Sequence, residues 1–155
     1  MSSNIAFIFP GQGAQYVGMG KDFYQAFPES RAVIDEADRI LGNGLKDVMF
    51  NGPEDQLTDT SYCQPAILAA SIAAWKALRL KFPRLDPAFV AGLSLGEYSA
   101  VTSSGALSFA DTVRLVERRG FFMQEAAALK KGSMAAVIGL DAVKIKVICD
   151  QCRVE

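Results

Sequence analysis

The sequence contains no histidine and three cysteines among its 155 residues. The odd number of cysteines argues against a framework of disulfides. Cys149 and Cys152 form a Cys-x-x-Cys pair, but a zinc site needs further ligands, and the chain has neither a second such pair nor a histidine. A redox pair is expected between a strand and the start of a helix, whereas this pair ends a helical-looking segment. These absences argue against metal-binding and redox functions.

The sequence also lacks an excess of charge of one sign and long apolar runs. The 16 basic and 17 acidic residues give a formal charge of −1 without a long run of one sign, so binding to nucleic acid is not expected. The apolar stretch that begins at Ile5 stops at Pro10, which is too short for the core of a signal peptide or for a membrane span. Half of the residues are hydrophobic. We therefore expect a soluble, globular, cytoplasmic protein with no membrane partner.

Apolar runs that alternate with helical patterns predict an α/β fold, with a parallel sheet covered by helices. Residues 5–9 and 88–92 are short apolar runs flanked by turn residues, a pattern typical of strands buried on both faces. Capping residues, prolines and glycines set the expected helix ends. The predicted helices are 30–41 with Ser30 as N-cap, 66–81 with Pro65 at the first position, 95–103, 109–130 behind a Ser108-x-x-Asp111 capping pattern, and 141–152.

A second unit is expected near Gly132. Residues 134–140 look like a strand and are followed by the predicted helix 141–152, after which the sequence stops without a return strand. We therefore predict a core over residues 1–131 and the beginning of a truncated second unit over residues 132–155.

Residues 92–96 read Gly-Leu-Ser-Leu-Gly, the Gly-x-Ser-x-Gly pattern of a nucleophile elbow. Such a short pattern can arise by chance, but here a predicted strand enters it and a predicted helix leaves it, as the motif requires. The tight turn leaves room only for glycine at Gly92 and Gly96. Ser94 would then project at the start of a helix, where backbone N–H groups favour negative charge, and the N–H of Leu95 would be one oxyanion donor. Ser94 is the candidate nucleophile.

A second glycine-rich segment, Pro10-Gly-Gln-Gly-Ala-Gln15, follows the first predicted strand. It has neither the spacing of a dinucleotide-binding loop nor the Lys-Ser/Thr of a phosphate-binding loop. Its glycines allow backbone N–H groups to point into the crevice where open α/β sheets bind ligands. An ordinary strand-to-helix turn remains the alternative.

Arg119 lies on the apolar stripe of the predicted helix 109–130. Its neighbours three and four positions away are all apolar, so its charge needs an anionic partner. The planar guanidinium suits a carboxylate. That partner is either a structural Asp or Glu or the carboxylate of a ligand, and the sequence leaves both open.

Together these segments resemble one family: the malonyl-CoA:acyl-carrier-protein transacylases of fatty acid synthesis, with the related acyltransferase domains of polyketide synthases. The resemblance runs from residue 5 to about residue 148. It implies a hydrolase-like α/β core and the start of a smaller ferredoxin-like subdomain. The similar segments are residues 9–15, 62–67, 92–100 and 114–120, with 134–140 at the opening of the subdomain.

The resemblance implies a role for each site residue. Ser94 resembles the serine that takes malonyl from coenzyme A as an ester and passes it to the phosphopantetheine thiol of acyl carrier protein. The backbone N–H groups of Gln12 and Leu95 would form the oxyanion hole. Arg119 would pair with the free carboxylate of malonyl, and Gln64 resembles a glutamine near that pocket. The implied reaction is a ping-pong transfer in fatty acid biosynthesis, with malonyl-CoA as substrate, acyl carrier protein as partner and no bound cofactor or metal.

Two departures from the family bear on activity. Leu93 stands where the family usually has a histidine before the nucleophile, which bears on pocket polarity and acyl selectivity. The family's general base is a histidine downstream of the segment that begins near Met134, and this sequence has none. We therefore expect a truncated transacylase that is nearly inactive as it stands. The alternatives are an acyl hydrolase of the same fold, a non-catalytic remnant that binds coenzyme A or carrier protein, and, more distantly, an ordinary α/β-hydrolase esterase.

Overall fold

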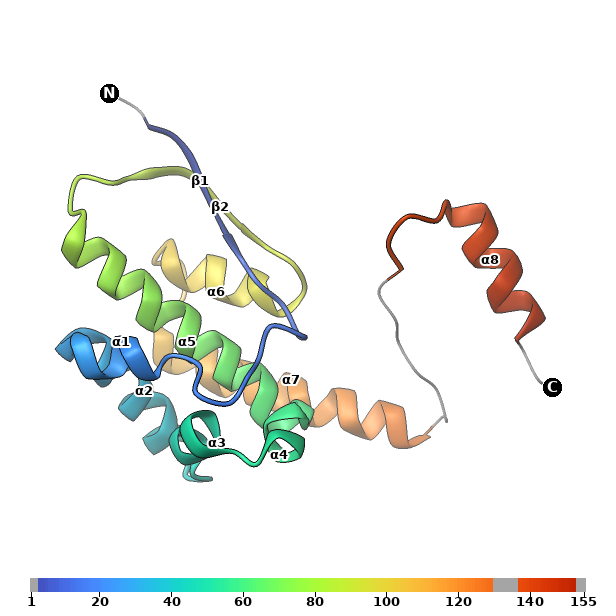
Figure 1. Ribbon diagram of the computed structural model, residues 1–155, viewed down its shortest axis with the longest axis horizontal. Coiled ribbons are helices and arrows are strands. Elements are labelled where there is room, and N and C mark those ends of the chain that lie inside the picture. The colour runs from blue at the N-terminus through green and yellow to red at the C-terminus, as the bar shows by residue number, and fades with distance from the viewer. Residues whose placement is uncertain (1–2, 130–136, 153–155) are drawn as a thin grey trace. The chain divides into compact units, whose positions relative to one another are not determined.

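The computed structural model describes residues 3–129 and 137–152 (Figure 1). The chain divides into two compact units, Met1–Glu125 and Ala126–Glu155. No helix within the described ranges is both long and apolar enough to cross a membrane. In chain order the elements are β1 (Ser3–Phe9), α1 (Lys21–Ala26), α2 (Pro28–Leu41), α3 (Leu45–Asn51), α4 (Glu54–Thr58), α5 (Thr60–Lys81), β2 (Pro87–Gly92), α6 (Leu95–Ser103), α7 (Phe109–Leu129) and α8 (Ala142–Gln151).

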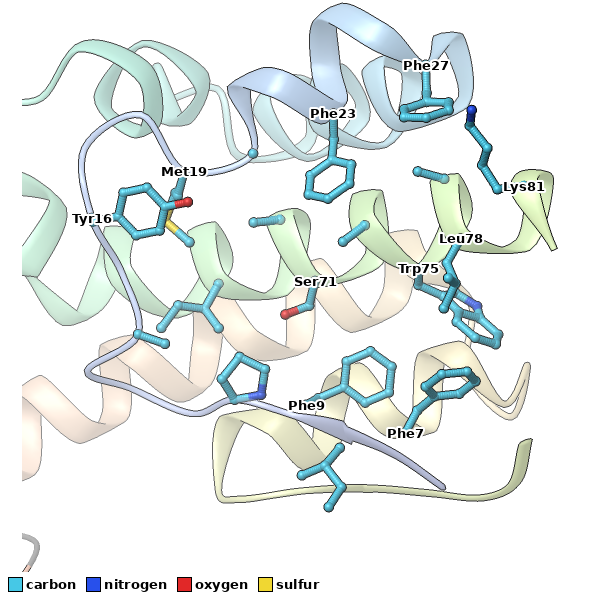
Figure 2. A pocket seen from close by; sticks show the side chains of 18 of the residues that line it. Phe7, Phe9, Tyr16, Met19, Phe23, Phe27, Ser71, Trp75, Leu78 and Lys81 are labelled. Atoms are coloured by element: carbon cyan, nitrogen blue, oxygen red, sulfur yellow. The ribbon is translucent and has the colours of Figure 1, made fainter. Parts of the chain in front are cut away.

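The two strands pair in parallel, with Phe7 opposite Val90 and Phe9 opposite Gly92. Helix α6 lies against both strands and also packs on α5 (Figure 1). On the covered face, the ring of Phe7 meets that of Trp75 on α5 at 5.1 Å between centroids. The predicted α/β class is confirmed. Beside β1 lies an apolar cavity of about 580 Å³, bounded on its other sides by α1 and α5 (Figure 2).

The prediction that both strands are buried on both faces is wrong. Side chains alternate between the two faces of a strand, and the face opposite Phe7 and Phe9 is open. On that face Ile8 is 78% exposed and Phe89 is 75% exposed. The described residues form a sheet of two strands only, and among the helices of the first unit it is α6 that packs against both strands.

The core of the first unit forms around α5. This helix is apolar nearly all round and buries residues along most of its length, as expected for a helix surrounded by others. Helices α2, α3, α6 and α7 each add fully buried side chains to the same cluster. One side chain from each of these four helices illustrates this burial, since each is 0% exposed: Ile34, Met49, Leu95 and Val116.

Two predicted helix starts are wrong. Helix α2 begins at Pro28 rather than after Ser30, and the Ser30 hydroxyl is buried and donates to the carbonyl of Ala73 at 2.7 Å, so it joins α2 to α5. Helix α5 begins at Thr60, because Asp59 caps it by accepting from the N–H of Ser61 at 2.8 Å. Pro65 therefore lies inside the helix, where one backbone hydrogen bond is lost, rather than at its first position.

Other helix predictions are confirmed. The Ser108 hydroxyl accepts from the N–H of Asp111 at 3.1 Å at the start of α7, and Gly42 ends α2 with a φ of 62°. In the second unit, Asp141 caps α8 by accepting from the N–H of Lys144 at 3.0 Å. The predicted strand 134–140 lies partly outside the described residues, and residues 137–140 form no strand.

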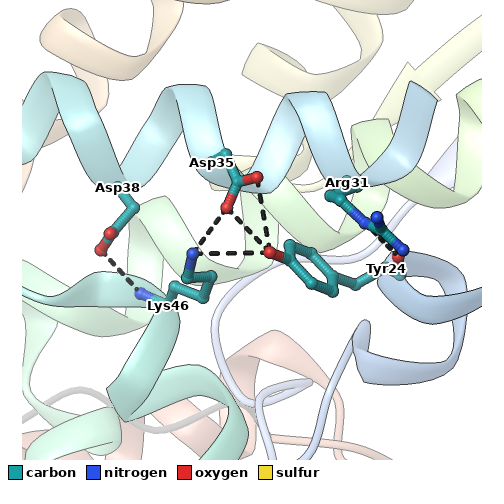
Figure 3. A network of polar contacts seen from close by, with 5 residues as sticks. All are labelled: Tyr24, Arg31, Asp35, Asp38 and Lys46. Carbon is teal, nitrogen blue, oxygen red and sulfur yellow. Dashed lines mark hydrogen bonds and ion pairs between the residues drawn. The ribbon is translucent and has the colours of Figure 1, made fainter. Parts of the chain in front are cut away.

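A polar network joins the first three helices, which the sequence did not predict as a group (Figure 3). Lys46 of α3 donates through Nζ to Asp35 of α2 at 2.6 Å and through its backbone N–H to Asp38 at 3.0 Å. The Tyr24 hydroxyl of α1 donates to the same Asp35 at 3.1 Å. The hydrogen bond that Lys46 donates to Asp35 raises the pKa of Lys46. The network fixes α1 and α3 against α2.

Replacing Asp59 by alanine should lower the free energy of unfolding by about 1 kcal/mol at pH 7, the usual cost of losing an N-cap. Besides capping α5, Asp59 accepts from Gln124 of α7 at 2.8 Å. Hydrogen bonds from Ser61 hold the pKa of Asp59 below its ordinary value. This contribution is therefore present above the unfolded-state pKa and is lost as pH falls through the lower folded-state pKa.

Urea unfolding of both proteins at pH 7 and at pH 3 measures this difference, which should shrink at the lower pH. Asp22→Ala is the matched control, since Asp22 lies in the first turn of α1 but caps no helix. An equal loss of stability in the two variants would contradict the capping role.

Candidate active site

Ser94 lies at the sharp turn between β2 and α6. Its φ of 54° and ψ of −103° make it the sole non-glycine residue with positive φ among residues 3–129 and 137–152. Such backbone strain is typical of a nucleophile elbow. The Ser94 side chain makes no capping hydrogen bond to α6. Ser94 is exposed at the N-terminus of α6, and its hydroxyl is not used to cap the helix.

Two glycines make this turn possible. A Cβ at Gly92 would overlap the backbone of Gly96, in agreement with the expected close approach across the elbow. A Cβ at Gly96 would overlap the carbonyl oxygen of Phe9 and lie 2.9 Å from that of Pro10. Gly96 is therefore required also because α6 begins directly against the end of β1, which the sequence pattern did not reveal.

The glycine-rich loop after β1 runs against the elbow. A Cβ at Gly11 would lie 2.6 Å from the carbonyl oxygen of Leu93, so only glycine allows the loop to come this close. Gln12 follows on the exposed side of the loop, and the N–H of Gly13 donates to Oε1 of Gln15 at 2.8 Å. Leu95 begins α6, where helical geometry leaves its N–H without an intrahelical acceptor. The structure thus brings the loop and the elbow together at one edge of the sheet.

Arg119 reaches from α7 to the nucleophile. Its Nη2 donates to Ser94 Oγ at 2.7 Å, and its Nη1 donates to Oε1 of Gln64. Gln64 is fully buried on α5, and its Nε2 contacts Sδ of Met123 at 3.3 Å. The buried amide therefore holds the guanidinium in place over Ser94.

Within the described part of the chain, Arg119 forms no ion pair with an aspartate or glutamate. The sequence left two possible partners for Arg119, a structural carboxylate or the carboxylate of a ligand. The described residues provide no structural carboxylate. A cation held beside a nucleophile without an anionic partner is suited to a ligand that brings its own negative charge.

Sequence reasoning missed Tyr98 and the contact made by Met123. The Arg119 guanidinium carbon lies 5.6 Å from the centroid of the Tyr98 ring, within the range of a cation–π interaction. Tyr98 comes four positions after Ser94, one turn along α6, so a helical spacing from the nucleophile could have indicated it. The guanidinium thus has an aromatic ring on one side and an amide on another.

No side chain among residues 3–129 and 137–152 that could act as a base is hydrogen-bonded to Ser94. Burial raises the pKa of Cys63 to about 11, so this thiol is protonated at neutral pH. Leu93, which precedes the nucleophile, is 76% exposed and offers no proton acceptor. The one side chain of the described residues hydrogen-bonded to Ser94 is Arg119, a permanent cation that cannot take a proton. The elbow therefore lacks a general base in this part of the molecule.

Comparison with known proteins decides the family. The family model of the acyl transferase domain matches residues 6–154. The chain belongs to this family. The malonyl CoA-acyl carrier protein transacylase of Bacillus subtilis strain 168 is 46% identical over 153 residues, which are 99% of this chain and 48% of that protein. The protein of the same name from Escherichia coli K12 is 44% identical over 149 residues, 96% of this chain and 48% of its own length.

Solved structures of acyl transferase domains superpose on the chain. The malonyl-CoA:acyl carrier protein transacylase of Xanthomonas oryzae pv. oryzae gives a TM-score of 0.83 at 36% identity over 97% of this chain and 48% of that one. A malonyl-transacylase solved in complex with a type II polyketide synthase acyl-carrier protein gives 0.82 at 40% identity, over 96% and 48% of the two chains. The chain thus spans about half the length of the acyl transferases that it matches.

Proposed function

We propose that this acyl transferase domain takes part in the transfer of malonyl from malonyl-CoA to the phosphopantetheine thiol of acyl carrier protein, in fatty acid biosynthesis. Ser94 forms the malonyl ester, Arg119 binds the free carboxylate of the malonyl group, and Gln64 positions Arg119. The relatives that support this proposal are malonyl CoA-acyl carrier protein transacylases. The reaction needs no bound cofactor or metal.

The observation that carries the proposal is the contact between Arg119 Nη2 and Ser94 Oγ at 2.7 Å. An acyl group attached to Ser94 lies beside the guanidinium, so a short acyl chain that ends in a carboxylate meets a cation without an anionic partner. A charge-assisted pair of this kind is stronger than a hydrogen bond between neutral groups. An uncharged acyl group would gain nothing from it.

The elbow and the loop supply the remaining steps. Ser94 Oγ attacks the thioester carbonyl, and negative charge develops on the carbonyl oxygen, where the N–H groups of Leu95 and Gln12 donate. The C–S bond then breaks, and coenzyme A leaves as a thiol with the proton that Ser94 gave up. In the second half-reaction the carrier thiol attacks the ester, and Ser94 regains its proton.

The Ser94 proton needs an acceptor, and the described residues that touch Ser94 offer none. Loss of the base from a catalytic triad typically costs about 10⁴-fold or more in rate. We therefore propose that the chain by itself acylates slowly, and that residues 132–155 begin the smaller ferredoxin-like subdomain of the full enzyme.

A non-catalytic remnant that binds malonyl-CoA without turnover is the second candidate, and the missing base is the observation that favours it. An acyl hydrolase is less well supported, because hydrolysis of uncharged acyl groups has no use for Arg119.

Mass spectrometry of the intact protein after incubation with malonyl-CoA tests the proposal. We expect one malonyl group on the wild-type chain and none on Ser94→Ala, with acylation roughly 10⁴-fold slower than that of the full-length Bacillus subtilis relative. Acetyl-CoA is the matched substrate control and should acylate less.

The absence of an adduct from a folded chain that binds malonyl-CoA would favour the remnant. Equal acylation by acetyl-CoA would favour the hydrolase. A malonyl adduct on Ser94→Ala would show that another residue is the nucleophile.

A further inference from the structure

The Arg119 guanidinium is in contact with three side chains that carry no negative charge. Gln64 of α5 accepts from its Nη1, and Ser94 Oγ accepts from its Nη2 at 2.7 Å. The centroid of the Tyr98 ring, on α6, lies 5.6 Å from the guanidinium carbon. A cation at this distance is attracted by the electrons of an aromatic ring, more strongly where water is partly excluded. The guanidinium is therefore held in place while it keeps its full charge.

The contact with Tyr98 differs from the other two because it uses no hydrogen-bond donor of the guanidinium. An arginine side chain has five N–H groups, and Gln64 and Ser94 accept from its two terminal nitrogens. An aspartate or glutamate in the place of the ring would occupy further N–H groups and neutralise the charge. The ring attracts the cation and leaves the charge and the remaining N–H groups available to a ligand.

The turn of α6 that carries Tyr98 is joined to the helix that carries Arg119. The Thr102 hydroxyl of α6 lies 2.8 Å from the carbonyl oxygen of Tyr98 and 2.8 Å from the hydroxyl of Thr112 on α7. The Tyr98 side chain is half-buried and packs against the core of the first unit. The ring is thus fixed relative to α7, so its attraction favours one position of the guanidinium.

The contact with Ser94 is the one that acylation changes. When the malonyl ester forms, Oγ becomes the linking oxygen of the ester, and the carboxylate of the acyl group takes the Nη2 donor. Among the described side chains named above, Gln64 and Tyr98 are then left to orient the guanidinium. The contribution of the ring should therefore be largest when the carboxylate is bound.

We propose that Tyr98 is a positioning residue for Arg119 and that it raises the selectivity of the site for acyl groups that end in a carboxylate. This inference rests on the proposed function, in which Arg119 binds that carboxylate. Two parallel hydrogen bonds to a carboxylate require a defined orientation of the planar guanidinium. Tyr98 supplies part of that orientation without competing for the donors.

Three substitutions at position 98 test the role of the ring. Tyr98→Leu and Tyr98→Met keep an apolar side chain but remove the ring, whereas Tyr98→Phe keeps the ring and removes the hydroxyl. All titrations use a Ser94→Ala background, in which no ester forms and the contact with Oγ is absent, as it is in the acylated chain. Calorimetry measures the affinities for malonyl-CoA and for acetyl-CoA.

We expect both variants without a ring to bind malonyl-CoA about 3- to 30-fold more weakly, the usual range for loss of a cation–π contact. Acetyl-CoA has no free carboxylate, so its affinity should stay within about twofold. Tyr98→Phe should retain the malonyl-CoA affinity within about threefold. In an Arg119→Ala background, Tyr98→Leu should cause no further loss, because the two residues act through one contact.

Phe50→Leu is the matched control. Phe50 of α3 is also half-buried against the core, and its ring centroid lies 5.9 Å from Nζ of Lys21. The variant loses the same kind of ring and the same kind of contact away from Ser94, so both affinities should stay within about twofold. Urea midpoints show which variants are folded, and Tyr98→Met replaces Tyr98→Leu if the leucine variant is not.

Unchanged malonyl-CoA affinity in the variants without a ring would overturn the inference. So would an equal loss for acetyl-CoA, which would mean that Tyr98 only supports the fold, or an equal loss in Tyr98→Phe, which would assign the effect to the hydroxyl. Arg119→Ala alone separates this inference from the proposed function. If that variant keeps the malonyl preference, the proposed function fails and the inference with it; if it loses the preference, the results at position 98 judge the inference alone.

Discussion

Replacing Arg119 by alanine should abolish the preference of the chain for malonyl-CoA over acetyl-CoA. The guanidinium lies over Ser94, held by Gln64 and Tyr98, and has no ion-pair partner among the described carboxylates. Loss of a charge-assisted, two-pronged contact costs about 2–4 kcal/mol, which is roughly 30- to 1000-fold in affinity. Binding of acetyl-CoA, which has no free carboxylate, should hardly change. Calorimetric titration with the two thioesters measures both affinities.

Two further variants sharpen this experiment. Arg118→Ala removes the neighbouring cation, which points to the ring of Phe122 rather than to Ser94, and should leave both affinities unchanged. Arg119→Lys keeps the charge but loses the planar fork, so it should recover only part of the malonyl preference. Equal loss of malonyl-CoA binding in Arg118→Ala and Arg119→Ala would show that general charge, and not the placed guanidinium, attracts the substrate.

Replacing Gly96 by alanine should lower the free energy of unfolding by about 3 kcal/mol, the upper end of the usual cost of overpacking. The added Cβ would overlap the carbonyl oxygen of Phe9, and this backbone atom cannot move without separating β1 from the elbow. That cost is a large fraction of the stability of a small domain. The variant should also lose Ser94 acylation, because the loop and the elbow no longer meet. Urea unfolding and intact mass measure the two effects.

Gly42→Ala is the control for this experiment. A Cβ at Gly42 meets nothing within 4 Å, but the φ of 62° is unfavourable for alanine. This strain alone should cost roughly 1–2 kcal/mol, with acylation unchanged. A Gly96→Ala chain as stable as the Gly42→Ala chain would mean that the backbone contact between α6 and β1 is not tight in solution.

The sequence predicted the parts of the fold that depend on local signals. The strands 5–9 and 88–92, the cap at Ser108 and the glycine end of α2 each follow from a few adjacent residues, and the structure has them. Ser30 does not cap a helix because its hydroxyl donates to the carbonyl of Ala73, which is 43 positions away in the sequence. Pro65 does not begin α5 because Asp59 already caps this helix at an earlier position. Burial of the strands depends on what covers the sheet, and no local pattern contains that information.

In the site, too, the sequence predicted what adjacent residues determine and missed what depends on contacts between distant residues. Ser94 and its glycines could be found because the elbow is a local motif. Arg119 could be suspected as a charge on an apolar stripe, but its approach to Ser94 joins residues 25 positions apart. Tyr98 and Met123 were missed because an aromatic ring and a thioether look like core residues until the guanidinium is in place beside them. The roles of Gln12, Leu95 and Gln64 remain predictions.

The positive φ of Ser94 affects which residue selection favours at position 94. A glycine at residue 94 would relieve the backbone strain, which at such sites is of the order of 1–3 kcal/mol, so selection for stability alone favours loss of the hydroxyl. Only selection for the chemistry opposes that drift. Homologous chains that are released from catalysis should therefore exchange the serine for glycine early, while the surrounding glycines, which the packing itself requires, persist.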